Sequence, residues 1–231
     1  MSEIGARLSK LRARIADAAR RSGRTPDSVR LLAVSKTQSV EAMREAYAAG
    51  QRSYGENYVQ ELASKAEALA DLNDLSFHFI GHLQTNKARD AARFAHVVES
   101  VDRPELATEL DRRASREIEV YVEVNVGGEA QKSGCAIHDV GALLEHLRSC
   151  EHLRAKGLMA IPPAHDDPEA SRPHFRAMRE LFERLRAEGH DELVELSMGM
   201  SADFEIAIEE GATIVRVGTA LFGERRPKQE R

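Results

Sequence analysis

Lys36 is the residue of this chain whose position most strongly suggests covalent chemistry. It follows the apolar run Leu31-Leu-Ala-Val34, at the point where a buried strand is expected to end. An ammonium group at such a place is costly unless something engages it. A desolvated lysine also loses its proton readily and becomes a nucleophile for imine formation. The alternative is a lysine that simply reaches solvent beyond the strand, and on this residue alone it stays open.

Two later segments carry the residue types that hold a phosphate. Ser197-Met-Gly-Met-Ser201-Ala-Asp203 stands directly ahead of an expected helix, and Gly218-Thr219 follows an expected strand at the start of a short helical turn. Glycines and hydroxyl residues in such places gather backbone N–H groups around an anion. Ordinary capping of the helix by Ser201 or Asp203 is the alternative for the first segment.

Arg216 has apolar neighbours on both sides in the expected strand 213–217, so its guanidinium should be buried. Strand alternation places Ile214, Arg216 and Gly218 on one face. Because arginine keeps its proton, it needs an acceptor. That acceptor is either an acidic side chain such as Glu56 or Glu123, or an atom of a ligand that lies across the end of the sheet.

These three features together suggest a site for pyridoxal 5′-phosphate (PLP). Lys36 would form a Schiff base with the aldehyde, the two later segments would hold the phosphate, and Arg216 would face the pyridine nitrogen. Since arginine only donates hydrogen bonds, that nitrogen would stay unprotonated and would withdraw electrons weakly. A cofactor-free aldolase that uses Lys36 on sugar phosphates shares the lysine and the phosphate site, but it leaves Arg216 unexplained.

The composition is that of a soluble globular protein. The chain has 231 residues, of which 42% are hydrophobic and 31% charged, and its net charge of −5 argues against nucleic acid or an anionic membrane as the main partner. No apolar run approaches a membrane span, and the first residues are no secretory signal. Cys135 and Cys150 lack CxxC spacing, and the nine histidines form no metal motif. We therefore expect a cytoplasmic protein with reduced thiols and no metal, a monomer or a small oligomer, of which we favour the monomer.

The elements that must position these residues alternate along the chain. Ile4, Leu8, Leu11 and Ile15 recur at helical spacing and predict an amino-terminal helix within residues 1–23. Short apolar runs predict strands at 30–35, 52–54, 77–80, 97–101, 118–126, 155–161, 194–198 and 213–217. Helical patterns between them lie at 40–49, 57–70, 104–116, 139–149, 173–188 and 202–210, and several end at a glycine.

Eight strands that alternate with helices predict an α/β fold, a (β/α)₈ TIM barrel with an extra amino-terminal helix. The main alternative, an open doubly wound sheet, lacks its GxGxxG fingerprint after the first strand. No proline- or serine-rich linker divides the chain, so we expect one domain over residues 1–231, with a loose polar tail at 224–231. A barrel places its active site at the carboxyl ends of the strands, which is where the residues named above are expected to meet.

The same residues resemble a known family, the pyridoxal phosphate homeostasis proteins, which are related in fold to the N-terminal barrel of bacterial alanine racemase. The matching motifs run in order from about residue 30 to residue 223. They include Ala33-Val-Ser-Lys-Thr37, Tyr54-Gly-Glu-Asn-Tyr-Val-Gln-Glu61, His78-Phe-Ile-Gly-His-Leu-Gln-Thr-Asn-Lys87, Glu99-Ser-Val-Asp102, Val124-Asn-Val-Gly-Gly-Glu-Ala-Gln-Lys-Ser-Gly134, Gly157-Leu-Met-Ala-Ile-Pro162, Ser197-Met-Gly-Met-Ser-Ala-Asp203 and Val215-Arg-Val-Gly-Thr-Ala-Leu-Phe-Gly223.

The resemblance implies a role for seven residues. It gives Lys36 as the Schiff-base lysine, Asn57 and Met159 beside the ring, Ser201, Gly218 and Thr219 on the phosphate, and Arg216 at the pyridine nitrogen. Lys132 matches a family lysine linked to PLP handling, with a solvated loop lysine as the alternative. Phe77 replaces a tryptophan frequent in the family, and Gly127-Gly128 replaces a more polar pair.

The resemblance also implies a PLP carrier that supplies apo-enzymes rather than an enzyme. Alanine racemase continues into a β-rich domain that places a tyrosine acid/base on the opposite face of the cofactor, whereas this chain ends shortly after Gly223. General acid/base catalysis needs a group positioned at the proton. A PLP-dependent amino-acid racemase or lyase is the alternative function.

Overall fold

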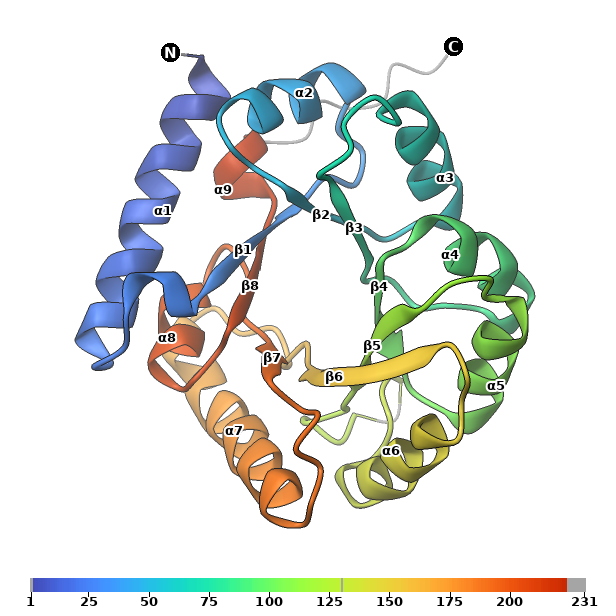
Figure 1. Cartoon of the computed structure of the whole chain (residues 1–231). Coiled ribbons are helices and arrows are strands. Elements are labelled where there is room, and N and C mark those ends of the chain that lie inside the picture. The colour runs from blue at the N-terminus through green and yellow to red at the C-terminus, as the bar shows by residue number, and fades with distance from the viewer. Residues whose placement is uncertain (1, 130, 224–231) are drawn as a thin grey trace.

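The computed structural model describes residues 2–129 and 131–223, and it contains a closed barrel of eight parallel strands (Figure 1). Each strand pairs with the next, and β8 closes the ring against β1. This confirms the barrel and excludes the open sheet. The expected tail at 224–231 lies outside the described residues. The strands are β1 (Arg30–Val34), β2 (Ser53–Glu56), β3 (Ser76–Phe79), β4 (Val97–Val101), β5 (Ile118–Glu123), β6 (Leu153–Met159), β7 (Glu195–Ser197) and β8 (Ile214–Val217).

Helices surround the barrel, and α1 lies along the outside of it beside α8 and α9 (Figure 1). Ser2 caps α1 by accepting a hydrogen bond from the Gly5 N–H, and the apolar face predicted from the sequence is buried. The helices are α1 (Glu3–Arg21), α2 (Val40–Ala48), α3 (Val59–Ala68), α4 (Ala88–Phe94), α5 (Pro104–Arg113), α6 (Val140–Arg148), α7 (Arg172–Ala187), α8 (Phe204–Glu209) and α9 (Thr219–Phe222). Short 3₁₀ turns occupy Pro26–Ser28, Thr85–Lys87, Ile137–Asp139 and Pro168–Ser171.

The glycines expected to end helices do so. Gly50, Gly189 and Gly211 have φ angles of 93°, 101° and 106° after α2, α7 and α8. Glycine adopts this left-handed conformation without steric cost, which stops the helix and turns the chain toward the next strand.

Several boundaries differ from those expected. The strand expected at 118–126 ends at Glu123, because the Asn125 side chain accepts a hydrogen bond from the Glu129 N–H at 3.2 Å and donates to the Glu129 carbonyl at 2.8 Å. That local ring turns the chain out of the sheet. The helix α4 was not expected, since its seven residues are too few to show a clear apolar repeat.

The barrel interior combines apolar and charged side chains. Its apolar cluster consists of Leu32, Ile80, Val97, Tyr121, Met159 and Ile214, all at most 8% exposed. Charged and polar strand residues are buried as well, and they include His78, Glu99, Ser197 and Arg216. Buried charges require partners, so the packing of these four side chains determines what the barrel can bind.

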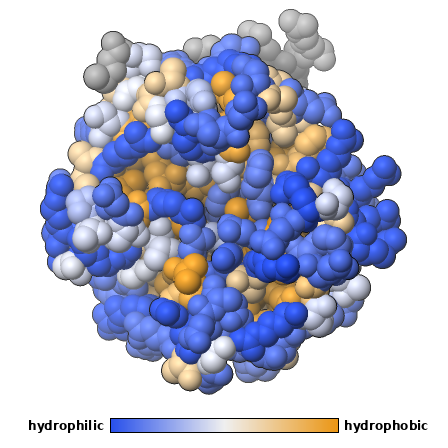
Figure 2. Space-filling model, in the orientation of Figure 1, coloured by the Kyte–Doolittle hydropathy of each residue, from blue (hydrophilic) through white to orange (hydrophobic). Residues whose placement is uncertain are grey.

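The outer surface is mainly polar on the face seen in Figure 1. The same view in space-filling form shows hydrophilic residues over most of that face, with hydrophobic ones in small separate areas (Figure 2). Scattered apolar residues of this kind are ordinary on a soluble protein.

Candidate cofactor-binding site

Lys36 lies at the carboxyl end of the barrel beside Gly218 and Thr219. These two residues belong to the predicted phosphate site and are called the phosphate corner below. Lys36 is half-buried just beyond β1 and lines a hollow of about 30 Å³ with Gly218 and Thr219. The pairing of Ala33 with Val217 brings the ends of β1 and β8 to the same level. The sequence prediction that an amine and an anion-binding turn lie together is therefore consistent with the fold.

Close packing against Val34 favours glycine at position 218. A Cβ atom at this position would lie 3.1 Å from the Val34 carbonyl oxygen, which is tighter than ordinary contact. Thr219 is the first residue of α9, and the first N–H groups of any helix have no partner within that helix. An anion placed at this turn would approach the backbone without a side chain in the way.

The segment before α8 is fixed to the same corner. The Arg216 N–H donates to the Gly199 carbonyl at 2.9 Å, and Gly199 has a φ of 89°. A Cβ at Gly199 would lie 2.5 Å from the Ala207 Cβ, so glycine is required. Asp203 is the N-cap residue of α8, but its carboxylate accepts from the Met200 N–H at 2.7 Å instead of from the helix. Ser201 lies half-buried in this turn.

Arg216 is buried inside the barrel, 3% exposed, and its hydrogen bonds go to the end of β7 and to the residue directly after β6. Its Nη1 donates to the Ser197 carbonyl at 2.7 Å and to the Ser197 Oγ at 2.8 Å, and its Nη2 donates to the Ala160 carbonyl at 2.8 Å. Burial lowers the pKa of Arg216, while the negative charges of Glu99 and Glu123 oppose that shift.

A direct pair of Arg216 with Glu56, considered from the sequence, is wrong, because the Glu56 Oε1 lies 2.8 Å from the Lys65 Nζ. The carboxylate connected to Arg216 is Glu99, through Ser197. The Ser197 Oγ donates to the Glu99 Oε2 at 2.6 Å. This chain of contacts leaves the guanidinium held in place by protein groups, with a negative charge close by.

Glu99 is fully buried and closes the network on its other side. Its Oε1 lies 2.6 Å from the Nδ1 of His78. Burial alone would raise the pKa of Glu99, but the hydrogen bond and charge of His78, together with Arg216 and Ser197, hold it below its usual value. Glu99 is therefore a carboxylate at neutral pH, and it supplies the counter-charge that a buried arginine requires.

A second hollow of about 260 Å³ opens at the barrel mouth, over the ends of β2, β3 and β5. Asn57, Glu123 and Lys132 are among its lining residues, with the exposed His82. Met159, fully buried, pairs with Glu123 across β5 and β6. The residues predicted from the sequence thus follow the ends of β1, β2, β6, β7 and β8 around one mouth.

Two of the residues that line this hollow each have a buried acceptor atom without a hydrogen-bond partner among the described residues. These atoms are the Asn57 Oδ1 and the Glu123 Oε2. Burial, and then the charge of Asp102, raise the pKa of Glu123 to about 7, although Arg216 opposes them. Unpaired buried acceptors are costly, so this hollow favours a ligand that donates hydrogen bonds.

Asn57 and Lys132 are each tied to a neighbouring loop. A Cβ at Gly81 would lie only 2.2 Å from the Asn57 carbonyl oxygen, so the glycine after β3 lets the two loops pack against each other. Lys132 forms an ion pair with Glu129 at 2.6 Å and donates to the Pro162 carbonyl at 3.2 Å. This lysine therefore links the loop after β5 to the segment after β6.

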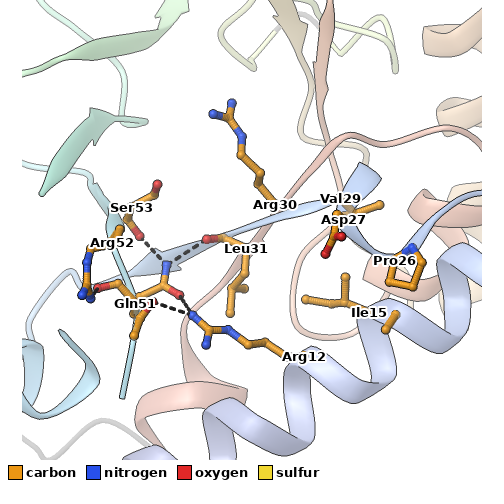
Figure 3. A pocket seen from close by; sticks show the side chains of 12 residues that line it. Arg12, Ile15, Pro26, Asp27, Val29, Arg30, Leu31, Gln51, Arg52 and Ser53 are labelled. Carbon is orange, nitrogen blue, oxygen red and sulfur yellow. Dashed lines mark hydrogen bonds between the residues drawn. The ribbon is translucent and has the colours of Figure 1, made fainter. Parts of the chain in front are cut away.

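Another hollow, of about 460 Å³, lies at the amino-terminal ends of β1 and β2, beside α1 (Figure 3). There Arg12 donates to the Gly50 carbonyl, and the amide of Gln51 donates to the Leu31 and Ser53 carbonyls, each at 2.8 Å. These polar groups satisfy one another and join α1 to the barrel. In barrels this end contributes to stability rather than to chemistry.

Within residues 2–129 and 131–223, no group of three or more His, Cys, Asp or Glu side chains is arranged to hold a metal ion. None of the helices in that part of the chain has both the length and the apolar character needed to cross a bilayer.

Comparison with known proteins gives consistent relatives. A family model described as "Alanine racemase, N-terminal domain" matches residues 6–226. The chain is 48% identical over 223 residues to the pyridoxal phosphate homeostasis protein of Aquifex aeolicus. The aligned region covers 95% of this chain and 97% of that protein. It is 49% identical over 228 residues to the protein of the same name from Pseudomonas aeruginosa, with 97% of each covered.

Solved structures extend the comparison. PipY of Synechococcus elongatus, in a structure with PLP bound, is 40% identical and gives a TM-score of 0.84 over 96% of this chain and 100% of that chain. Alanine racemase from Corynebacterium glutamicum gives a TM-score of 0.70 at 18% identity, over 96% of this chain and 64% of that chain. The similarity to this alanine racemase is one of fold alone.

Proposed function

The chain belongs to the alanine racemase N-terminal domain family and, within it, to the pyridoxal phosphate homeostasis proteins, and we propose that it binds PLP at the barrel mouth as a Schiff base on Lys36. The observation that carries the proposal is the shared corner of Lys36, Gly218 and Thr219. An amine and an anion-binding turn at one corner match a ligand that carries both an aldehyde and a phosphate.

The residues around this corner fit the cofactor. In our proposal Ser201, Gly218 and Thr219 hold the phosphate, Asn57 and Met159 lie beside the ring, and Arg216 faces the pyridine nitrogen. The unpaired, buried Asn57 Oδ1 provides an acceptor for a ligand donor, and a Cβ at position 218 would crowd the turn. When bound, PLP supplies an aldehyde that condenses with an amine and a ring that withdraws electrons.

Arg216 favours a carrier over an enzyme. Its guanidinium is fixed by Ser197 and Ala160 and only donates hydrogen bonds. A pyridine nitrogen opposite such a donor stays unprotonated, and the ring is then a weak electron sink. We therefore propose that the protein is not an enzyme but a cytoplasmic, monomeric PLP reservoir that supplies PLP to apo-enzymes. The names of its relatives support the homeostasis role.

Borohydride reduction tests the covalent attachment. Protein loaded with PLP, reduced, digested and analysed by peptide mass spectrometry should carry the pyridoxyl group on Lys36, because that amine lies beside the phosphate corner. Lys132, which lines the second hollow at the barrel mouth, is the internal comparison. Modification of Lys132 with Lys36 unmodified would contradict the proposal.

One observation favours an enzymatic alternative, a PLP-dependent amino-acid racemase or lyase. Glu123, which lines the mouth hollow and has a pKa of about 7 and an unpaired buried oxygen, has the properties of a general base near neutral pH. Such an enzyme would exchange the Cα proton of amino acids with solvent deuterium, faster as pH rises through about 7, and Glu123→Gln would abolish the exchange.

We expect the wild-type protein to exchange the Cα proton no faster than free PLP does. NMR of an amino-acid panel measures it, and enzyme-like exchange would overturn the carrier role.

A further inference from the structure

A second lysine lies close to Lys36 in a cluster that the sequence analysis did not identify. Lys65, on α3, is 6% exposed. Its Nζ donates to the Ser35 carbonyl at 2.7 Å, to the Glu56 Oε1 at 2.8 Å and to the Glu61 Oε2 at 2.9 Å. Three acceptors match the three protons of an ammonium group, so Lys65 has a full set of partners.

The two carboxylates also bond the residues on either side of Lys36. Glu56, fully buried at the end of β2, accepts a hydrogen bond from the Ser35 Oγ at 2.6 Å. Glu61 accepts one from the Thr37 N–H at 2.8 Å. The neighbour before Lys36 and the neighbour after it are therefore both attached to the Lys65 cluster.

Thr37 shows that this attachment constrains the backbone. Its φ of 64° makes it the one non-glycine residue with positive φ in the described part of the chain. A β-branched residue is strained in this left-handed conformation, which persists only where surrounding contacts enforce it. Here the Glu61 hydrogen bond to the Thr37 N–H is such a contact, and it sets the turn from which the Lys36 side chain extends.

Two opposing effects act on the pKa of Glu56 in this cluster. Burial raises the pKa of Glu56, but the charge and hydrogen bond of Lys65 and the hydrogen bond of Ser35 oppose that shift. Without Lys65, two carboxylates would remain beside the turn with no ammonium between them. Loss of the ammonium that both carboxylates share would weaken the hold on Glu56 and Glu61 and loosen their bonds to Ser35 and Thr37.

We propose that Lys65, Glu56 and Glu61 form a positioning cluster that sets the direction of the Lys36 amine toward the phosphate corner. The inference rests on the proposed function, since it assigns the purpose of the cluster to Schiff-base formation at Lys36. Lys65 acts through Ser35 and Thr37 and does not itself react. A reacting amine misplaced by about 1 Å can slow its reaction by roughly 100-fold.

The test measures the rate of Schiff-base formation separately from noncovalent ligand affinity. In Lys65→Met, whose side chain is of similar length without the charge, Schiff-base formation with PLP followed by stopped-flow absorbance should slow by roughly tenfold or more. Pyridoxine 5′-phosphate has the same ring and phosphate but no aldehyde, and its dissociation constant should change by less than about twofold. Lys10→Met, at an exposed lysine on α1, is the matched control for both measurements.

A second substitution gives a rescue that a merely structural role would not. Glycine adopts a φ of 64° without cost, so Thr37→Gly added to Lys65→Met should recover part of the lost rate. In the wild-type background Thr37→Gly should change the rate little. Should Lys65→Met not fold, Glu61→Ala removes the Thr37 contact from a half-buried position and should give the same loss of rate and the same rescue.

The outcomes are distinct. A wild-type rate in folded Lys65→Met, or an equal loss of rate and of pyridoxine 5′-phosphate affinity with no rescue by Thr37→Gly, would overturn the positioning role. A wild-type protein that binds pyridoxine 5′-phosphate but forms no Schiff base would instead overturn the proposed function.

Discussion

Replacing Lys36 by alanine is expected to abolish the Schiff-base absorbance band of the PLP-loaded protein. Schiff-base formation needs an amine at this position, and the neighbouring ammonium of Lys65 is held by three acceptors. The phosphate corner and Arg216 remain in Lys36→Ala, so PLP binding should weaken by roughly 100-fold, about 3 kcal/mol, rather than vanish. Absorbance spectra and equilibrium dialysis measure the two effects separately.

Lys132→Ala is the matched control for this experiment. It removes a half-buried lysine that lines the second hollow at the barrel mouth and pairs with Glu129, and it should leave the Schiff-base absorbance of the loaded protein unchanged. A Lys36→Ala protein that keeps the absorbance would contradict the covalent proposal. One that loses PLP completely would show that the phosphate corner contributes little by itself.

The barrel was predictable because its signals are local. Alternating apolar runs specify strands, and glycines such as Gly50 and Gly211 end helices through a conformation that other residues avoid. Strand alternation likewise predicted that Arg216 shares a face with Ile214, and both side chains are buried. These features depend on a few consecutive residues, so the sequence displays them directly.

The partner of Arg216 was not predictable in the same way. Glu99 reaches Arg216 through Ser197, and those residues lie on β4, β7 and β8. Their levels in the barrel depend on the register of the sheet, and the β4–β5 pairing shifts between Val98 and Val101. A one-residue shift exchanges the two faces of a strand, so alternation could not give the position of Glu99.

Lys65 was missed for a different reason. With Glu61 at i−4 it looks like an ordinary exposed ion pair on a helix surface. Its burial follows from the packing of α3 over Ser35 and Glu56, which lie 30 and 9 residues away in the chain. A charge pattern along one helix does not show which face the barrel covers.

The buried network around Glu99 should make it the most sensitive position for stability. Glu99→Leu removes the counter-charge of Arg216 and leaves two strong donors, the Ser197 hydroxyl and His78, without their acceptor. Removal of one partner of a buried ion pair typically costs 3–5 kcal/mol, and we expect a loss of about 4 kcal/mol in the free energy of unfolding. Urea denaturation of the cofactor-free protein measures it.

The pH dependence gives a second signature of the same residue. Because the folded-state pKa of Glu99 lies below its ordinary value of 4.5, its contribution is present above pH 4.5 and is lost as pH falls through the lowered value. The stability difference between wild type and Glu99→Leu should therefore be constant near neutral pH and should narrow only in acid. A difference that instead changes between pH 6 and 8 would assign the effect to another group.

A double-mutant cycle shows whether the loss comes from the uncompensated arginine. Arg216→Met in the Glu99→Leu background replaces the remaining buried charge by an apolar side chain, and it should recover a large part of the lost stability. Asp17→Ala, which breaks an exposed pair with Arg20 on α1, should cost less than about 1 kcal/mol and serves as the surface control. If the two interior substitutions were simply additive, Glu99 and Arg216 would not be coupled. The negative charge that compensates the Arg216 guanidinium would then have to come from another residue of the barrel.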